Sequence, residues 1–127
     1  MILLLLKLWW SYLMTTLFPS EFLEQKAFVN WFRLNFKDLI LFSIPNEGYR
    51  HNGNKFVDTG LLKGIPDLQI LFPNGKSLFI EMKKRNGKLN PNQKKLIPKI
   101  ENLGFTVLIG YGFLDAKDKF EQYLKQF

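Results

Sequence analysis

The sequence has no cysteine, and His51 is its single histidine in 127 residues. Disulfide bonds and thiolate-bound zinc are therefore excluded, and any metal must be held mainly by carboxylate and carbonyl oxygens. Oxygen ligands of this kind favour Mg²⁺, Mn²⁺ or Ca²⁺. We interpret His51 as an exposed loop residue rather than as a metal ligand or a general base.

Acidic residues are also few relative to basic ones. The chain has 18 Lys and Arg against 11 Asp and Glu, which gives a net charge of +7. A surplus of this size suits a polyanionic partner, either nucleic acid or an anionic membrane surface. The hydrophobic fraction of 46% and the 13 Phe residues are ample for one core, so the composition indicates a single folded domain rather than a disordered chain.

Residues 1–17 are strongly apolar and carry one charge, at Lys7. Their length lies at the lower edge of the ~17–25 residues that span a membrane. They also lack the basic start and the small-residue cleavage site of a signal peptide. Three interpretations stay open: a start upstream of a natural Met14, a loosely packed apolar extension, and a membrane anchor. We favour the first two, and we treat 18–127 as the folded domain.

The remaining residues predict alternating helices and strands. Helices are expected over 20–36, 90–103 and 114–124, and strands over 39–44, 67–72, 77–83 and 105–109. Pro73-Asn74-Gly75-Lys76 has the residues of a tight turn, which makes 67–83 a β-hairpin. The Gly- and Asn-rich stretch 45–65 is expected to be a long connection, which is often functional. The order αβββαβα predicts an α/β fold of three layers around a mixed sheet.

Three polar residues on this hairpin are the strongest functional signal. Glu81 and Lys83 lie two residues apart on one strand, so their side chains point to the same face. Asp67 begins the other strand, and the hairpin brings it towards the end where Glu81 and Lys83 lie. Two carboxylates at one place repel each other unless a cation lies between them. The pattern therefore predicts a divalent metal site with an ammonium group beside it.

Such a site has the parts that phosphodiester hydrolysis requires. The reaction needs positive charge near the developing phosphorane oxygens and an activated, oriented water molecule. Lys83 can orient and deprotonate that water or can stabilise the phosphate charge, and the sequence leaves both roles open. An E-x-K triplet alone is more often a solvated strand end than a site, but its combination with Asp67 on one hairpin of a basic chain favours a nuclease.

The segments GIPDLQIL, LFIEMK, NGKLNPNQ and GFTVLIGYG resemble the VRR-NUC group of the PD-(D/E)xK nucleases. The resemblance runs from about Ser20 to Leu124. It implies a restriction-endonuclease-like fold, Mg²⁺ or Mn²⁺ as cofactor, and cleavage of branched or otherwise structured DNA. The stand-alone members, from phages and bacteria, are similar to Holliday-junction resolvases and act as homodimers, which implies a cytoplasmic homodimer here and makes a membrane partner unexpected.

The resemblance also implies roles for individual residues. Asp67 and Glu81 match the family's metal-binding acids, Lys83 matches its lysine, and Gln93 matches a glutamine near the active centre.

The family also uses a glutamate of the first helix as a metal ligand, for which the sequence offers Glu21 and Glu24. We prefer Glu24, because it shares a helix face with Phe28 and Trp31 and so is expected to look towards the core. The other interpretation of Glu24 is a first-turn acid that complements the helix dipole.

A run of basic residues over 83–99 contains no acid and begins at the predicted metal site. Such a run is usually a solvated face, but its position next to the carboxylates favours a surface that follows a phosphate backbone. The residues expected to contact DNA are Tyr49, Arg50, Lys55, Lys84, Arg85, Lys88, Lys94 and Lys95.

The sequence thus predicts a metal-dependent endonuclease that cuts DNA at junctions or flaps. The alternative is a non-catalytic, basic DNA-binding module of the same fold. RNA contains the same kind of scissile bond, and the sequence does not separate it from DNA as a substrate.

Overall fold

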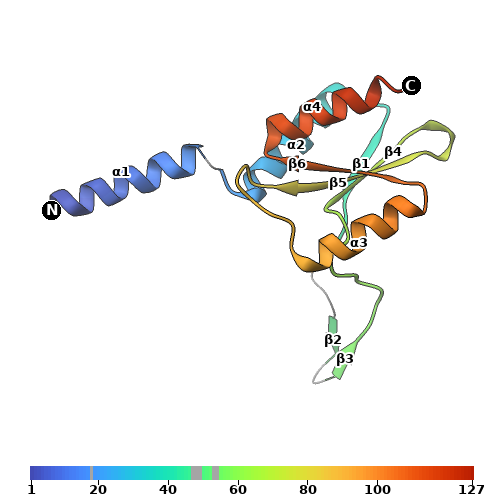
Figure 1. Ribbon diagram of the computed structural model, residues 1–127, viewed down its shortest axis with the longest axis horizontal. Helices are drawn as coiled ribbons and strands as arrows, with labels where there is room; N and C mark the ends of the chain where they lie inside the picture. The colour runs from blue at the N-terminus through green and yellow to red at the C-terminus, as the bar shows by residue number, and fades with distance from the viewer. Residues whose placement is uncertain (18, 47–49, 53–54) are drawn as a thin grey trace.

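The computed structural model describes residues 1–17, 19–46, 50–52 and 55–127. Its centre is a four-stranded mixed sheet with the order β1-β4-β5-β6 (Figure 1). Strands β1 (Ile40–Ser43), β4 (Leu68–Leu71) and β5 (Ser77–Lys83) are antiparallel neighbours, whereas β6 (Thr106–Tyr111) runs parallel to β5. The parallel pair needs a crossover, and helix α3 (Pro91–Asn102) provides it.

The β4–β5 hairpin confirms the pairing expected from the sequence. Leu68 pairs with Ile80, and Leu71 pairs with Ser77. The chain turns through a short 3₁₀ segment, η1 (Pro73–Gly75), in which Asn74 has φ 65° and Gly75 has φ 74°. These residue types tolerate a left-handed backbone, so the register that places Asp67 near the end of β5 is fixed by local turn chemistry.

Helices α2 (Glu21–Asn35) and α4 (Phe113–Leu124) cover one face of the sheet. Phe28 and Phe32 of α2 and Phe120 of α4 are fully buried against the inward side chains of the strands. Ser20 caps α2, because its side chain accepts a hydrogen bond from the N–H of Leu23. This face therefore holds the main hydrophobic core.

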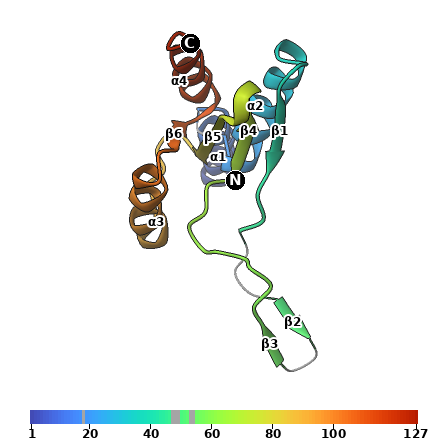
Figure 2. The same cartoon turned by 90° about the vertical axis from the view of Figure 1, so that its right-hand side faces the viewer.

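The opposite face of the sheet carries α3 (Figure 2). Leu78, Ile80 and Met82 of β5 point into the main core, so Glu81 must point to the α3 side by strand alternation. Gln93 of α3 contacts Glu81 there. The three layers and the order α2-β1-β4-β5-α3-β6-α4 confirm the predicted α/β/α class, and the fold is restriction-endonuclease-like.

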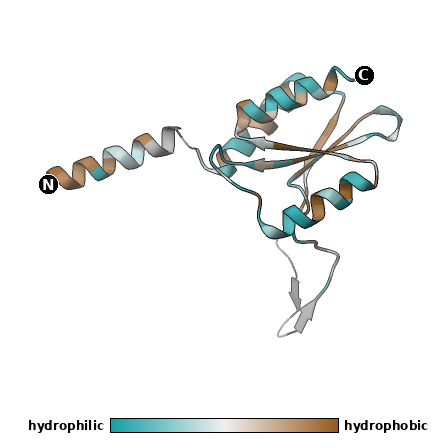
Figure 3. Ribbon diagram, in the orientation of Figure 1, coloured by the Kyte–Doolittle hydropathy of each residue, from teal (hydrophilic) through white to brown (hydrophobic). Residues whose placement is uncertain are grey.

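Two features extend beyond this core. Helix α1 (Ile2–Leu17) projects from the domain and is largely apolar (Figures 1 and 3). Among the described residues, no helix combines the length and the apolar character needed to cross a membrane. A small antiparallel hairpin, β2 (Arg50–Asn52) with β3 (Lys55–Val57), lies within the stretch that the sequence predicted as a connection.

Candidate metal centre

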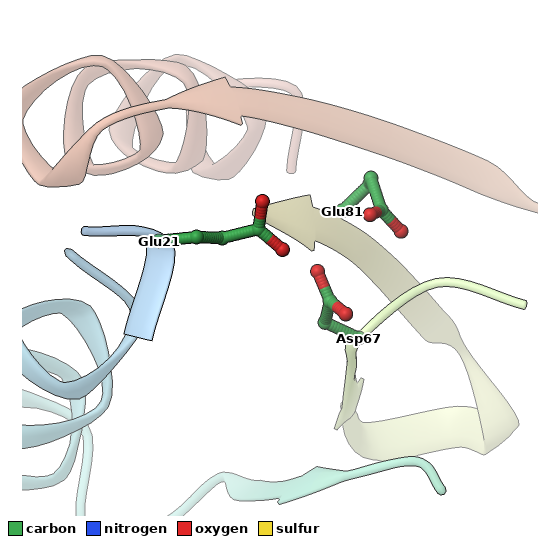
Figure 4. A group of neighbouring side chains, drawn as sticks. All are labelled: Glu21, Asp67 and Glu81. Atoms are coloured by element: carbon green, nitrogen blue, oxygen red, sulfur yellow. The ribbon is translucent and has the colours of Figure 1, made fainter. Parts of the chain in front are cut away.

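Three carboxyl groups from three elements meet at the end of β5. Glu21 comes from the first turn of α2, Asp67 directly precedes β4, and Glu81 lies near the end of β5. One oxygen atom of each lies within 4.8 Å of the others, and the carboxyl groups face one another (Figure 4). The hairpin brings Asp67 and Glu81 together as the sequence predicted, and the helix contributes the third acid.

The acids of this cluster are held in an environment that disfavours their charged forms. Glu81 is fully buried, and burial together with the charge of Asp67 raises its pKa to about 9. Burial also raises the pKa of Asp67, against the opposing effect of a hydrogen bond from the N–H of Met82. The pKa of Glu21 is raised by burial as well. The charged, deprotonated forms of these groups would therefore be stabilised by a nearby cation.

Lys83 supplies part of the required positive charge. Its Nζ atom lies 3.7 Å from Oε1 of Glu81 and 4.0 Å from Oε2 of Glu21, and the residue is buried. The cluster still combines one ammonium group with three carboxyl groups. Oε2 of Glu81 is buried and has no hydrogen-bond partner among the described residues. A hard divalent cation held by Glu21, Asp67 and Glu81 fits this donor set, because oxygen ligands are the ones it prefers.

Gln93 fixes the orientation of the Glu81 carboxyl group. Its Nε2 donates a hydrogen bond of 2.7 Å to Oε1 of Glu81. Its Oε1 accepts a hydrogen bond from the N–H of Asn90, whose side chain in turn accepts from the N–H of Gln93. This reciprocal cap begins α3. Gln93 thus links the start of a helix to the carboxyl cluster.

Asp67 is positioned by both backbone and side-chain contacts. The N–H of Met82 donates to its Oδ2 over 2.8 Å. The preceding loop is held by Asn46, whose amide donates to the carbonyl of Ile65 and accepts from the N–H of Gly64. In the sequence, Asn46 and Arg50 also fit an N-x-x-x-R pattern that the resemblance to the VRR-NUC group implies. Asn46 lies near the start of the long connection 45–65, and its side-chain amide can hold a distant backbone segment because it both donates and accepts hydrogen bonds.

Glu24, which the sequence analysis preferred as the ligand from the helix, lies outside the carboxyl cluster. It is buried as expected, but its Oε2 atom lies 3.5 Å from Nε of Arg85. A Cβ atom at Gly112 would approach that oxygen to 2.3 Å, so Glu24 is enclosed by the turn before α4. Facing the core therefore did not bring Glu24 into the carboxyl cluster, and the structure places Glu21 there instead.

The residues predicted to contact DNA fall into two groups. Lys84, Lys88, Lys94 and Lys95 are exposed, and Arg85 is also exposed and pairs with Glu24. Tyr49 lies outside the described residues. Arg50 and Lys55 belong to β2 and β3, but their side chains lie outside the described part of the structure.

Comparison with known families matches the family described as VRR-NUC domain to residues 13–113 of this 127-residue chain. The match covers the carboxyl cluster, Lys83 and Gln93, and it includes every strand of the sheet. No curated protein and no solved structure shows a significant match.

Proposed function

Because the chain belongs to the VRR-NUC family and contains a nuclease domain, we propose that it is a metal-dependent endonuclease of the PD-(D/E)xK type. Its proposed substrate is branched or otherwise structured DNA, such as a junction or a flap. The observation that carries the proposal is the convergence of Glu21, Asp67 and Glu81 around one point, with Lys83 beside them.

Glu21, Asp67 and Glu81 would hold Mg²⁺ or Mn²⁺. When bound, such an ion supplies positive charge for the phosphate in the transition state and favours the deprotonated form of a water molecule. The three carboxyl groups neutralise the ion and fix its place relative to the end of β5. Gln93 holds Glu81 in one orientation, and the N–H of Met82 does the same for Asp67. These contacts organise the ligands before substrate arrives.

Lys83 is the residue that acts on the reacting atoms. Its ammonium group lies within 4.0 Å of two of the three acids, so it reaches the same point as the cation would. From there it can orient the attacking water molecule or stabilise the charge on the phosphate oxygens. Lys83→Arg would keep the positive charge but change the shape of the donor, and a guanidinium group does not release its proton. The variant therefore separates electrostatic stabilisation of the phosphate from proton transfer.

The exposed lysines around the cluster would bind the DNA backbone. Lys84 and Lys88 follow β5, and Lys94 and Lys95 lie on the first turns of α3. Each phosphate contact releases a counterion, so binding should weaken steeply as salt is added. The proposed enzyme acts as a homodimer, since paired cuts on opposite strands need two active sites.

A cleavage assay tests this function. Labelled four-way junction and linear duplex DNA of matched sequence are incubated with the protein and Mg²⁺ or with EDTA. The wild type should cut the junction only with metal, and Lys83→Ala should lower the rate by roughly 10²-fold or more. Lys117→Ala is the matched control, because this half-buried lysine of α4 pairs with Glu121 and lies over the Trp31 ring, outside the carboxyl cluster. Tight metal-independent binding with no cutting by the wild type would favour a non-catalytic DNA-binding module instead.

A further inference from the structure

A groove runs between α2 and the edge strand β1. It encloses about 280 Å³, with side chains of α2 along one wall and residues of β1 and β4 along the other. Arg33 of α2 donates a hydrogen bond of 3.2 Å to the carbonyl of Leu41 in β1. This contact joins the two walls of the groove at the Arg33 end.

One end of this α2–β1 groove opens beside the carboxyl cluster. Gln25 lines it and lies one helical turn after Glu21, while Leu68 lines it and directly follows Asp67. Ser43, also in the lining, pairs with Leu68 in the sheet register. The far end lies at Arg33. Because a helix rises ~1.5 Å per residue, the wall from residue 22 to residue 33 is roughly 16 Å long, which matches a few nucleotides of one strand.

The lining has the chemistry of a nucleic-acid site. Lys26 and Arg33 supply positive charge, Gln25 and Asn30 supply amide groups, and none of the described lining residues is acidic. Phe22 lies at the end nearest the carboxyl cluster, with 74% of its surface exposed. An exposed ring one helical turn before Lys26 and next to the proposed phosphate-cutting site suits a base, because aromatic side chains stack on bases of any sequence.

We propose that the α2–β1 groove binds a single-stranded segment of the DNA substrate next to the scissile phosphate. Phe22 stacks on a base, while Lys26 and Arg33 contact phosphates of the strand that leads away from the scissile bond. A single strand fits because the groove is concave, is walled by one helix and the edge of the sheet, and combines cations with an exposed ring. The inference rests on the proposed nuclease function and adds the reason for a preference for flaps or junction arms over intact duplex.

The test measures binding in the absence of metal, so it does not depend on cleavage. Fluorescence anisotropy in EDTA compares a labelled blunt duplex with the same duplex carrying a single-stranded tail. The variants are Phe22→Ala combined with Lys26→Gln, and Lys117→Gln as a matched control on α4. The wild type should prefer the tailed DNA, and the double variant should lose roughly tenfold in affinity for it while binding the blunt duplex within about twofold.

Three outcomes would overturn the groove assignment. The first is a wild type that binds both DNAs with equal affinity. The second is a double variant that loses affinity equally for both DNAs. The third is a double variant whose affinity for the tailed DNA is unchanged. The salt dependence of binding gives a second measurement. Lys26→Gln alone should reduce the steepness of the plot of log affinity against log salt concentration for the tailed DNA by ~0.7. Failure of the nuclease function would appear separately, as a wild type that prefers tailed DNA in EDTA but cuts nothing with Mg²⁺ or Mn²⁺.

Discussion

At the scale of single residues, Glu81 links the site to the stability of the whole protein. Its pKa is about 9 in the folded protein against an ordinary value of 4.5, because burial and the charge of Asp67 disfavour the carboxylate. Between these values the folded state holds a proton that the unfolded state has released. The stabilisation is therefore complete below the unfolded pKa and is lost as the pH rises towards the folded one.

This linkage predicts that the metal-free protein loses stability from pH 5 to pH 9. The contribution of Glu81 to the slope cannot exceed about 1.4 kcal/mol per pH unit. Glu81→Gln should flatten the decline, because the amide has no proton to release. Urea denaturation in EDTA at several pH values measures both proteins. Parallel stability curves for wild type and variant would show that Glu81 does not titrate in this range.

The two glutamates of α2 should differ in metal binding. Glu21→Gln removes a carboxylate of the cluster, so the affinity for Mn²⁺ should fall roughly tenfold or more, which corresponds to ~1.4 kcal/mol. Glu24→Gln alters a group that faces Arg85, and the affinity should stay within about threefold of wild type. Titration calorimetry compares the three proteins. A larger loss for Glu24→Gln than for Glu21→Gln would restore the preference expected from the sequence.

The sequence predicted residues whose position follows from local rules. Asp67, Glu81 and Lys83 gather because strand alternation and a short turn determine where their side chains point. Gln93 was singled out by the family resemblance, and the structure shows its Nε2 donating a hydrogen bond to Glu81. Glu21 could not be chosen over Glu24 in the same way. The choice depends on the angle at which α2 approaches the sheet, which packing of the whole core decides.

At the scale of elements, the loop before Asp67 depends on a close approach to α3. Gly64 has φ +90°, and a Cβ atom there would lie 2.6 Å from the carbonyl oxygen of Asn92. Gly64→Ala should therefore lower the free energy of unfolding by roughly 1–3 kcal/mol, through backbone strain and a clash with the start of α3. Chemical denaturation of the purified variant measures this change.

Gly60→Ala provides the matched control for this prediction. Gly60 has φ +93°, but no atom lies within 4 Å of its added Cβ, so the variant should carry the backbone strain alone. Its loss should be roughly 1–2 kcal/mol at most. A loss at Gly60 equal to that at Gly64 would mean that the contact with Asn92 contributes nothing.

The elements of the core were largely predictable, whereas the extensions were not. Ser20, Asn90 and the turn at Asn74 and Gly75 are local signals, and the corresponding elements begin or end where these signals lie. The β2–β3 hairpin escaped prediction because its strands have three residues each and lie in a Gly- and Asn-rich stretch. So short a strand offers too few positions for an alternating pattern to be recognised.

At the scale of the whole molecule, α1 adds little to the stability of the domain. Its apolar side chains remain exposed, including Trp9 at 62% and Trp10 at 59%. Deletion of residues 2–13 should therefore leave the melting temperature within about 2 °C of the full chain. Differential scanning calorimetry tests this. A fall of several degrees would mean that α1 packs against the domain.

The fold class followed from the order of elements, because αβββαβα with one parallel crossover leaves few ways to cover both faces of a sheet. The assembly of the whole site was harder to predict from the sequence. It needs α2, the hairpin and α3 to meet at one end of the sheet, and only Asp67 and Glu81 are joined by a short connection. The groove between α2 and β1 likewise arises from tertiary packing, with no pattern in the sequence to mark it.

The most direct test of the account is the position of a manganese ion in a crystal of the wild-type protein. After a soak in Mn²⁺, anomalous scattering should show a peak between the carboxyl groups of Glu21, Asp67 and Glu81, at roughly 2.0–2.6 Å from an oxygen of each. A peak bound elsewhere on the protein, with these three side chains unchanged, would contradict the account.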